Sequence, residues 1–341
     1  MPVKIIFYLI ARLALLSTRL TVKRNKNTET NFELLLKYLI TKPLLTTNKK
    51  NKAYFALTAT SIIWGTTWVA SRIGVQHVPA LEVSYIRQFV AGSLFLIFFF
   101  IRGEKLPTWS QFRWLSTLSI FTFVLSNGFS TWSVKYISSG LAALISALNP
   151  LCVVMIEMIF FKKNNNTSLT FVGLFVGIAG VAIVFYENAF HQQTEGYGLG
   201  VMLGLIAMIG WSIGTIFVAR NKNRMDPYYA IGWQMFIGSF LICLLACTTG
   251  NNISFDEIPF QTWTAIGYLV GMGSIAAFAA FIYTVKYLPP AIASLYAYIN
   301  PIVAMVTGAI LLNEPLTFSL VIGAVITLTG VYIVNYSIKI R

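Results

Sequence analysis

The sequence predicts an all-α membrane protein, with ten transmembrane helices arranged as a 5+5 inverted repeat around a central cavity. Of its 341 residues, 57% are hydrophobic and only 11% are charged, whereas soluble domains carry about 25% charged residues. Ten apolar runs follow one another from Ala53 onward. In addition, the phrase around Asn149-Pro150 returns, at one constant offset, around Asn300-Pro301. A repeat of this length indicates internal duplication.

Residues 1–52 differ from the rest of the chain. The stretch from Ile5 to Val22 is apolar but contains Arg12 and Arg19, so it is too short and too charged for a typical span. No small-residue cleavage site follows its signal-like start. We interpret residues 1–52 as a basic, amphipathic extension. Two alternatives stay open: the extension is not part of the functional protein, or it contains an eleventh span.

Each of the ten later runs is long enough to cross the hydrocarbon core as a helix, and short connections separate them. We expect helices near 53–73, 81–101, 114–134, 139–161, 168–186, 198–219, 228–248, 263–285, 289–312 and 319–338. The duplication divides them into a first copy, residues 53–186, and a second copy, residues 198–338, followed by a short cytoplasmic tail, residues 339–341.

The connections predict the orientation. With the N-terminus in the cytoplasm, eleven Lys and Arg residues fall on the inner side and only two, Arg72 and Lys135, on the outer side. Cytoplasmic connections are enriched in these residues, so we expect a multi-pass inner-membrane protein with both termini in the cytoplasm. The net charge of +14 is spread over these connections and the basic extension, which argues against a nucleic-acid-binding face.

An odd number of spans per copy means that the second copy enters the membrane from the opposite side. Inverted repeats with interrupted helices at matching positions are typical of alternating-access transporters, whose site lies near the midplane. The Asn-Pro pairs are the candidate interruptions, because proline cannot donate a helical hydrogen bond. The alternative is a duplicated membrane scaffold that transports nothing.

Several short motifs carry a family resemblance. They are Trp64-Gly65, Arg87, the two Ala-x-Leu-x4-Asn-Pro stretches at Ala142 and Ala293, Leu312-Asn313-Glu314-Pro315, and Gly323 with Gly330. Over about residues 53–338 the chain resembles the EamA-like family of the drug/metabolite transporter superfamily. It departs from the pattern in the first copy, where Lys162-Lys163 stands near the place of the motif's Glu. The resemblance implies ten helices around a central cavity, cytoplasmic termini, and export or exchange of small organic molecules without ATP.

Polar residues beside the interruptions are the first candidates for the substrate cavity. The amides of Asn149 and Asn300 can donate and accept hydrogen bonds next to carbonyls freed by Pro150 and Pro301. Tyr296 lies one turn before Asn300 and shares its helix face. The competing interpretation is that these residues hold helices together and that the kinks are static.

Aromatic side chains form the second group of candidates, since they can supply an apolar wall with a polar tip. Trp64 and Trp211 are repeat partners deep in their spans, and Trp132 and Tyr283 are partners nearer the span ends. An interfacial aromatic belt also explains the second pair. Asn127 is a further polar candidate. The predicted cavity residues are thus Trp64, Asn127, Trp132, Asn149, Pro150, Trp211, Tyr283, Tyr296, Asn300 and Pro301.

Two charged residues fall inside expected spans. Charges in a membrane are expensive and indicate function by default. We consider Arg87 a candidate for binding an anionic substrate group and Glu157 a candidate for ion coupling. Both also lie close enough to a span end to reach the interface, and Glu157 could pair with Lys162 or Lys163.

The sequence therefore predicts a secondary transporter, not an enzyme, that exports a small organic solute such as an amino acid, a nucleobase-like metabolite or an amphipathic drug. The alternatives are a scaffold or sensor subunit and a membrane-embedded enzyme. No P-loop or metalloprotease motif is present, and Cys152, Cys243 and Cys247 lie in apolar runs without zinc spacing. We expect no cofactor, no metal and no nucleic acid partner. Small-residue spacings such as Gly173/Gly177 favour packing within one subunit over dimerisation, so we expect a monomer or weak homodimer in the lipid bilayer.

Overall fold

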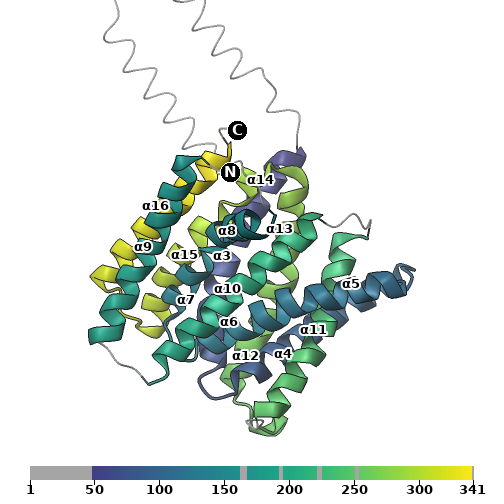
Figure 1. The fold of residues 1–341 in the computed structure, drawn as a ribbon. Helices are drawn as coiled ribbons and strands as arrows, with labels where there is room; N and C mark the ends of the chain where they lie inside the picture. The colour runs from purple at the N-terminus through teal and green to yellow at the C-terminus, as the bar shows by residue number, and fades with distance from the viewer. Residues whose placement is uncertain (1–47, 162–166, 192–194, 221–224, 250–252, 340–341) are drawn as a thin grey trace, which may run out of the picture. The chain divides into compact units, whose positions relative to one another are not determined.

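Helices form all of the regular secondary structure in the part of the chain that this computed structural model describes, residues 48–161, 167–191, 195–220, 225–249 and 253–339. The extension predicted at the N-terminus, up to residue 47, and Lys162-Lys163 lie outside the described residues. From Asn51 onward the chain forms one compact unit, which Figure 1 shows as a set of tilted helices.

The first five helical segments are α3 (Asn48–Gly74), α4 (Ala80–Ile101), a jointed segment of α5 (Trp109–Ser119), η1 (Ile120–Gly128) and α6 (Phe129–Ser133), a second jointed segment of α7 (Ser139–Ser146) and α8 (Asn149–Phe161), and α9 (Ser168–His191). The next five are α10 (Tyr197–Arg220), α11 (Pro227–Thr249), the jointed segment of α12 (Phe260–Tyr268), η3 (Leu269–Ala276) and α13 (Ala277–Tyr287), the jointed segment of α14 (Pro290–Ala293) and α15 (Tyr296–Leu312), and α16 (Phe318–Lys339). A 3₁₀ turn, η2 (Phe255–Glu257), precedes α12. Each expected run corresponds to one of these segments.

The surface of these segments is suited to lipid. Seven helical stretches among the described residues are long and apolar enough to cross a membrane, and Tyr296–Leu312 is a shorter apolar helix. Large apolar side chains point outward, including Phe175 at 75% and Ile310 at 71% exposure. Soluble proteins rarely expose contiguous apolar surface, so the chain is a multi-pass all-α membrane protein, as predicted.

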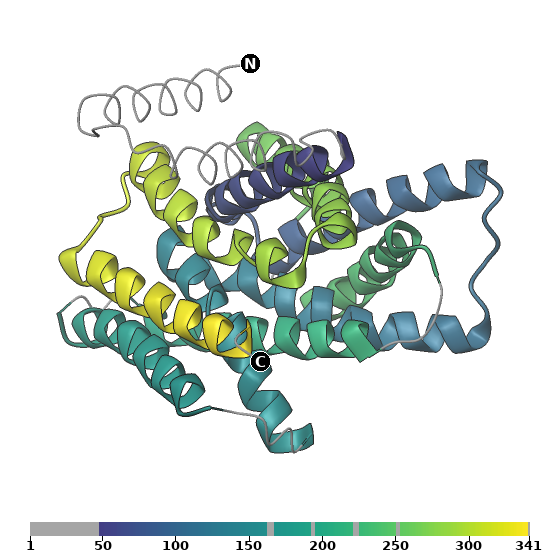
Figure 2. The same ribbon diagram turned by 90° about the horizontal axis from the view of Figure 1, so that it is seen from above.

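Equivalent helices of the two copies pack against each other. Helices α9 and α16 lie side by side in both views (Figures 1 and 2). A Cβ at Gly173 would meet Gly330 O at 2.9 Å, whereas one at Gly180 would meet Gly323 O at 2.7 Å. As residue numbers increase along α9, the contacting residues of α16 decrease in number, so the two helices are antiparallel. Glycine at the contact lets their backbones approach closely.

Helices α4 and α11 pair in the same way. A Cβ at Gly92 would lie 2.6 Å from Phe236 N, and the rings of Phe99 and Tyr229 are 5.2 Å apart. A higher residue number on α4 again contacts a lower one on α11, so these two helices are also antiparallel. In both pairs a helix runs opposite to its equivalent in the other copy, as expected for an inverted repeat with an odd number of spans per copy.

The two Asn-Pro helices are interrupted at different places. The first breaks at Ala147 and Leu148, so that α8 begins at Asn149 with Pro150 in its first turn, where proline is tolerated. The second breaks between α14 and α15, before Tyr296, and Pro301 lies inside α15. The expectation of matching interruptions at both Asn-Pro pairs was therefore wrong for the second copy.

Two stretches of π-helix were not predicted. They are η1 and η3, and they occupy equivalent positions in the third segment of each copy. A π turn widens the helix and redirects its side chains, and such turns are frequent at functional sites. Both stretches contribute contacts to the cavity residues described next.

Candidate solute-binding cavity

A cavity of about 110 Å³ lies between the two copies. A water molecule needs roughly 10–15 Å³ by the same measure, so the cavity has room for several waters or one small solute. Side chains from both copies line it: Trp64, Thr67, Trp68, Ser71, Arg87, Ser126, Asn127, Ser130, Thr131, Ser133, Ala142, Ser146, Gly204, Ala207, Met208, Trp211, Phe278, Tyr296 and Asn300.

Arg87 supplies the charge of this cavity. It lies two turns into α4 and is only 5% exposed. Its Nε donates to Ser274 Oγ of η3 at 2.9 Å. Among the described residues no carboxylate lies within ion-pair distance of it, and a buried cation without a counter-ion is costly. The structure thus leaves the guanidinium buried without a compensating carboxylate among the described residues.

Polar groups continue from Arg87 along η1 and α6. Asn127 Oδ1 accepts a hydrogen bond from Gln88 Nε2 at 2.8 Å, and Gln88 is itself fully buried. Ser130 and Thr131 donate to the Asn127 carbonyl at 3.0 and 2.8 Å. These bonds fix one wall of the cavity as a polar surface beside the guanidinium.

Aromatic side chains form a second part of the lining. The Trp64 ring makes edge contacts with Trp211, Phe278 and Tyr296, at centroid distances of 6.4, 5.1 and 5.2 Å. Trp64 Nε1 donates to Gly273 O in η3 at 3.1 Å. The cavity is thus amphipathic, since its lining combines charged and polar side chains with aromatic rings in edge contact.

The two asparagines of the interrupted helices lie at one edge of this site. Asn300 lines the cavity, and its Oδ1 is buried without a hydrogen-bond partner among the described residues. Asn149 lies outside the main cavity and lines an adjoining pocket of about 20 Å³. Its Oδ1 accepts from Ser212 Oγ at 2.7 Å. Neither Pro150 nor Pro301 is among the lining residues.

Two predicted aromatic residues lie elsewhere. Trp132 packs on Phe129, with ring centroids 6.1 Å apart. Tyr283 packs on Tyr287 at 4.6 Å, near Leu57. Both lie near the ends of their segments and pack against residues of neighbouring helices. The structure thus does not bring them into the cavity with Trp64 and Trp211.

Glu157 also lies apart from the cavity. Its Oε1 is 3.7 Å from Arg220 Nη2, and Arg220 stacks on the ring of Phe161 at 3.3 Å. The carboxylate therefore pairs with α10, whereas the predicted partners Lys162 and Lys163 are outside the described residues. A role of Glu157 in ion coupling stays a prediction.

Some cavity and buried polar residues were missed in the sequence. The cavity is also lined by Ser126 of η1 and by Ser130 and Thr131 of α6. A cluster of small polar residues in mid-span was their only signal in the sequence. Glu82 was overlooked as a buried acid inside an expected span. It is 2% exposed and accepts from Tyr85 Oη and Ile253 N, both at 3.2 Å.

Comparison with known proteins identifies the group to which the chain is related. The model of the EamA-like transporter family matches residues 51–186 and 198–336. An uncharacterized inner membrane transporter of Escherichia coli K12, YedA, is 30% identical over 264 residues, which cover 77% of this chain and 83% of the relative. An uncharacterized transporter of Bacillus subtilis, YvbV, is 26% identical, with 85% and 93% covered.

A solved crystal structure shares the fold. It superposes with a TM-score of 0.58 at 16% identity and covers 83% of this chain and 96% of that structure's chain. The family match spans both copies of the inverted repeat. The chain therefore belongs to the EamA-like transporter family.

Proposed function

We propose that this chain is a secondary carrier that moves a small organic solute with a carboxylate group outward across the inner membrane, by alternating access and without ATP. The observation that carries the proposal is Arg87, a buried guanidinium that lines the cavity without a carboxylate partner among the described residues. A substrate carboxylate would supply the missing charge in a bidentate geometry.

The rest of the cavity supports the same class of solute. Its aromatic wall suits an apolar or planar side chain, and its polar wall suits amino or hydroxyl groups. The volume of about 110 Å³ favours molecules of amino-acid size. The same guanidinium would repel amphipathic cations, so among the solutes compatible with the sequence they are the least favoured.

A binding titration tests this proposal whichever way the solute is transported. Trp64, Trp68 and Trp211 line the cavity, so tryptophan fluorescence of the purified protein in nanodiscs should respond to a bound solute. The panel would contain amino acids, nucleobases and cationic dyes. We expect carboxylate-bearing solutes to bind. Arg87→Gln should weaken them about 30-fold or more, since loss of one partner of a buried charge pair costs about 2–5 kcal/mol.

A matched control separates the site from general charge effects. Arg102 caps the far end of the same helix, is exposed, and stacks on Phe98 at 4.3 Å. Arg102→Gln should leave the affinity unchanged. Equal affinities in wild type and Arg87→Gln, or preferential binding of cationic dyes, would contradict the proposed substrate class.

A further inference from the structure

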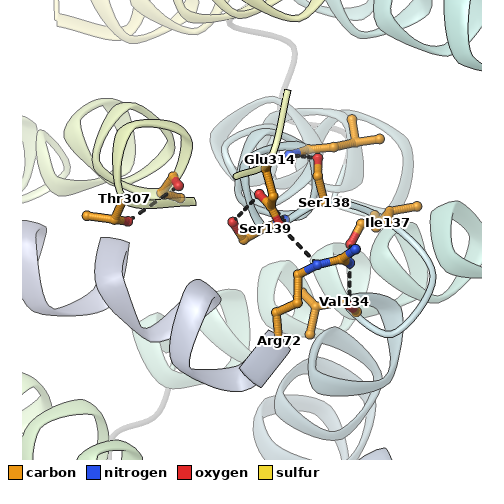
Figure 3. Close-up of polar contacts among 9 residues, drawn as sticks. Arg72, Val134, Ile137, Ser138, Ser139, Thr307 and Glu314 are labelled. Carbon is orange, nitrogen blue, oxygen red and sulfur yellow. Dashed lines mark hydrogen bonds and ion pairs between the residues drawn. The ribbon is translucent and has the colours of Figure 1, made fainter. Parts of the chain in front are cut away.

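An ion pair joins the C-terminal end of α3 to the segment that follows α15. Arg72 Nε lies 2.9 Å from Glu314 Oε1, and the Glu314 side chain is only 9% exposed. Figure 3 shows the two side chains pointing toward each other, with Ser139 beside Glu314. Sequence patterns marked Glu314 only as part of a motif and Arg72 only as an outer-side charge.

Each member of the pair also satisfies a helix end in the first copy. Arg72 Nη1 donates to Val134 O at 2.7 Å and to Ile137 O, just after α6. Glu314 accepts the Ser139 backbone N–H at 3.0 and 3.1 Å and its hydroxyl at 2.6 Å, at the start of α7. Helix C-termini carry partial negative charge and N-termini partial positive charge. The cation and the anion therefore each face the helix end that they complement.

The backbone after α15 delivers Glu314 to this place. Asn313 ends α15 in the left-handed conformation, with φ 53°, which asparagine tolerates better than most residues. The turn brings Glu314 N back to Gly308 O at 3.2 Å. A Cβ at Gly308 would overlap Glu314 Oε2, so the carboxylate needs glycine there. This geometry gives the Leu-Asn-Glu-Pro motif a physical reason.

The bonds cross between the two helix groups that enclose the cavity. Helix α3 packs on α15, where a Cβ at Gly65 would overlap the Val303 side chain. On the other side, α10 packs on α6, where Ser133 Oγ donates to Gly200 O at 2.7 Å. Arg72 and Glu314 belong to the first group, and Val134 and Ile137 adjoin the second. Helix α7, which begins at Ser139, packs on α15, where a Cβ at Gly140 would lie 2.6 Å from Met305 Cγ. A motion that parts α3 from α6 at this end must break the hydrogen bonds from Arg72 to Val134 O and Ile137 O.

The opposite end is held differently. There Arg220, in the last turn of α10 as Arg72 is in the last turn of α3, lies 3.7 Å from Glu157, with side chains 43% and 26% exposed. The Arg72–Glu314 pair is shorter and less exposed.

We propose that Arg72 and Glu314 form a latch that positions α7, with its cavity residues Ala142 and Ser146, and that the latch opens when the carrier changes the side to which its cavity faces. The inference rests on the proposed alternating-access function. Both residues lie outside the cavity, so the role assigned to them is to position α7. Because the helix is interrupted between α7 and α8, α7 can be held in place independently of α8.

Distances between spin labels test the latch whatever the solute is. Labels at Lys135 and Leu316, both exposed, report on the latched end, and labels at Phe160 and Lys286, also exposed, report on the other end. Cys152, Cys243 and Cys247 are first replaced by Ala. Hydrogen bonds to charged groups contribute about 1.5–3 kcal/mol each, so Glu314→Ala should raise the population of a longer Lys135–Leu316 distance about tenfold or more. The distance at the other end should shorten in parallel.

Milder variants and a control keep the test informative if Glu314→Ala fails to fold. Arg72→Lys keeps the charge but loses the fork that reaches two carbonyls and a carboxylate, and it should shift the same populations about threefold or more. Glu257→Gln removes a carboxylate that is exposed on the loop before α12 and should change neither distance.

A charge swap distinguishes a latch matched to the helix ends from a simple ion pair. In Arg72→Glu combined with Glu314→Arg, each charge faces the wrong helix end, so the wild-type distances should not return. Full restoration by the swap would overturn the inference. Unchanged distances in both Glu314→Ala and Arg72→Lys would also overturn it, while leaving solute binding at Arg87 untouched.

Discussion

At the residue scale, the position of Arg87 depends on the space beside Gly273 and on the hydrogen bond to Ser274. A Cβ at Gly273 would lie 2.7 Å from Thr67 Cγ2 and 3.1 Å from Arg87 Nη2. Both distances are shorter than an ordinary van der Waals contact between such atoms. The guanidinium therefore occupies space that only glycine in η3 leaves free.

This predicts that Gly273→Ala displaces Arg87 and weakens carboxylate binding. Because displacement of about 1 Å can disrupt a charged hydrogen-bond geometry, we expect an affinity loss of about tenfold in the fluorescence titration. Gly271→Ala is the matched control, since a Cβ at Gly271 has nothing within 4 Å. Equal losses in both variants would show that η3, and not the contact with Arg87, sets the affinity.

The sequence predicted part of this site. Trp64, Arg87, Asn127, Trp211, Tyr296 and Asn300 were chosen for their depth, polarity or repeat position, and the structure places them on one cavity. Trp132 and Tyr283 were chosen by the same repeat logic but face neighbouring helices. Repeat equivalence relates positions along a helix, whereas the direction of a side chain also depends on local winding, which the π stretches alter.

At the element scale, glycine contacts set how closely α9 and α16 approach. A Cβ at Gly330 would overlap Gly177 N and lie 2.7 Å from Gly173 O. These neighbours are backbone atoms, which cannot rotate away as a side chain can. The two helices would have to separate to admit a methyl group.

We therefore expect Gly330→Ala to destabilise the protein, since overpacking costs about 1–3 kcal/mol. A thermal unfolding scan in nanodiscs should show a Tm several degrees lower than wild type. Gly198→Ala, where a Cβ has nothing within 4 Å, should leave the Tm within error. A Tm for Gly330→Ala equal to that of Gly198→Ala would contradict the close crossing of α9 and α16.

The helix interruptions were only partly predictable. The prolines correctly predicted that both helices are interrupted, because proline lacks the hydrogen-bond donor that a continuous helix requires. They did not give the position of the break. In the first copy the chain breaks just before Asn149, and in the second it breaks before Tyr296 while Pro301 stays within α15. Packing around each helix decides between these solutions, and the pattern of apolar residues does not encode it.

At the scale of the whole molecule, the inverted repeat predicts the side of each connection. Lys135 and Lys286 are repeat partners and are both exposed. In an inverted repeat their connections lie on opposite sides of the membrane. Single cysteines at these positions in oriented vesicles should be labelled by an impermeant reagent from opposite sides, and labelling from the same side would contradict the inverted arrangement.

The composition made the ten segments predictable, because lipid requires long apolar runs and complete backbone hydrogen bonding. It could not show which side chains from distant segments meet. Arg72 and Glu314 looked like two unrelated loop charges, although they form a bonded set with Ser139. Such long-range pairs depend on how the copies pack, which no local pattern contains.

The central claim is that one cavity serves both sides of the membrane in turn. The most direct test is a single cysteine at Ser130, which lines the cavity, in a protein without the three native cysteines and reconstituted in oriented proteoliposomes. The account predicts that an impermeant thiol reagent labels Ser130→Cys from either side and that a bound carboxylate solute slows both reactions. Labelling from one side only, even after prolonged incubation, would contradict alternating access.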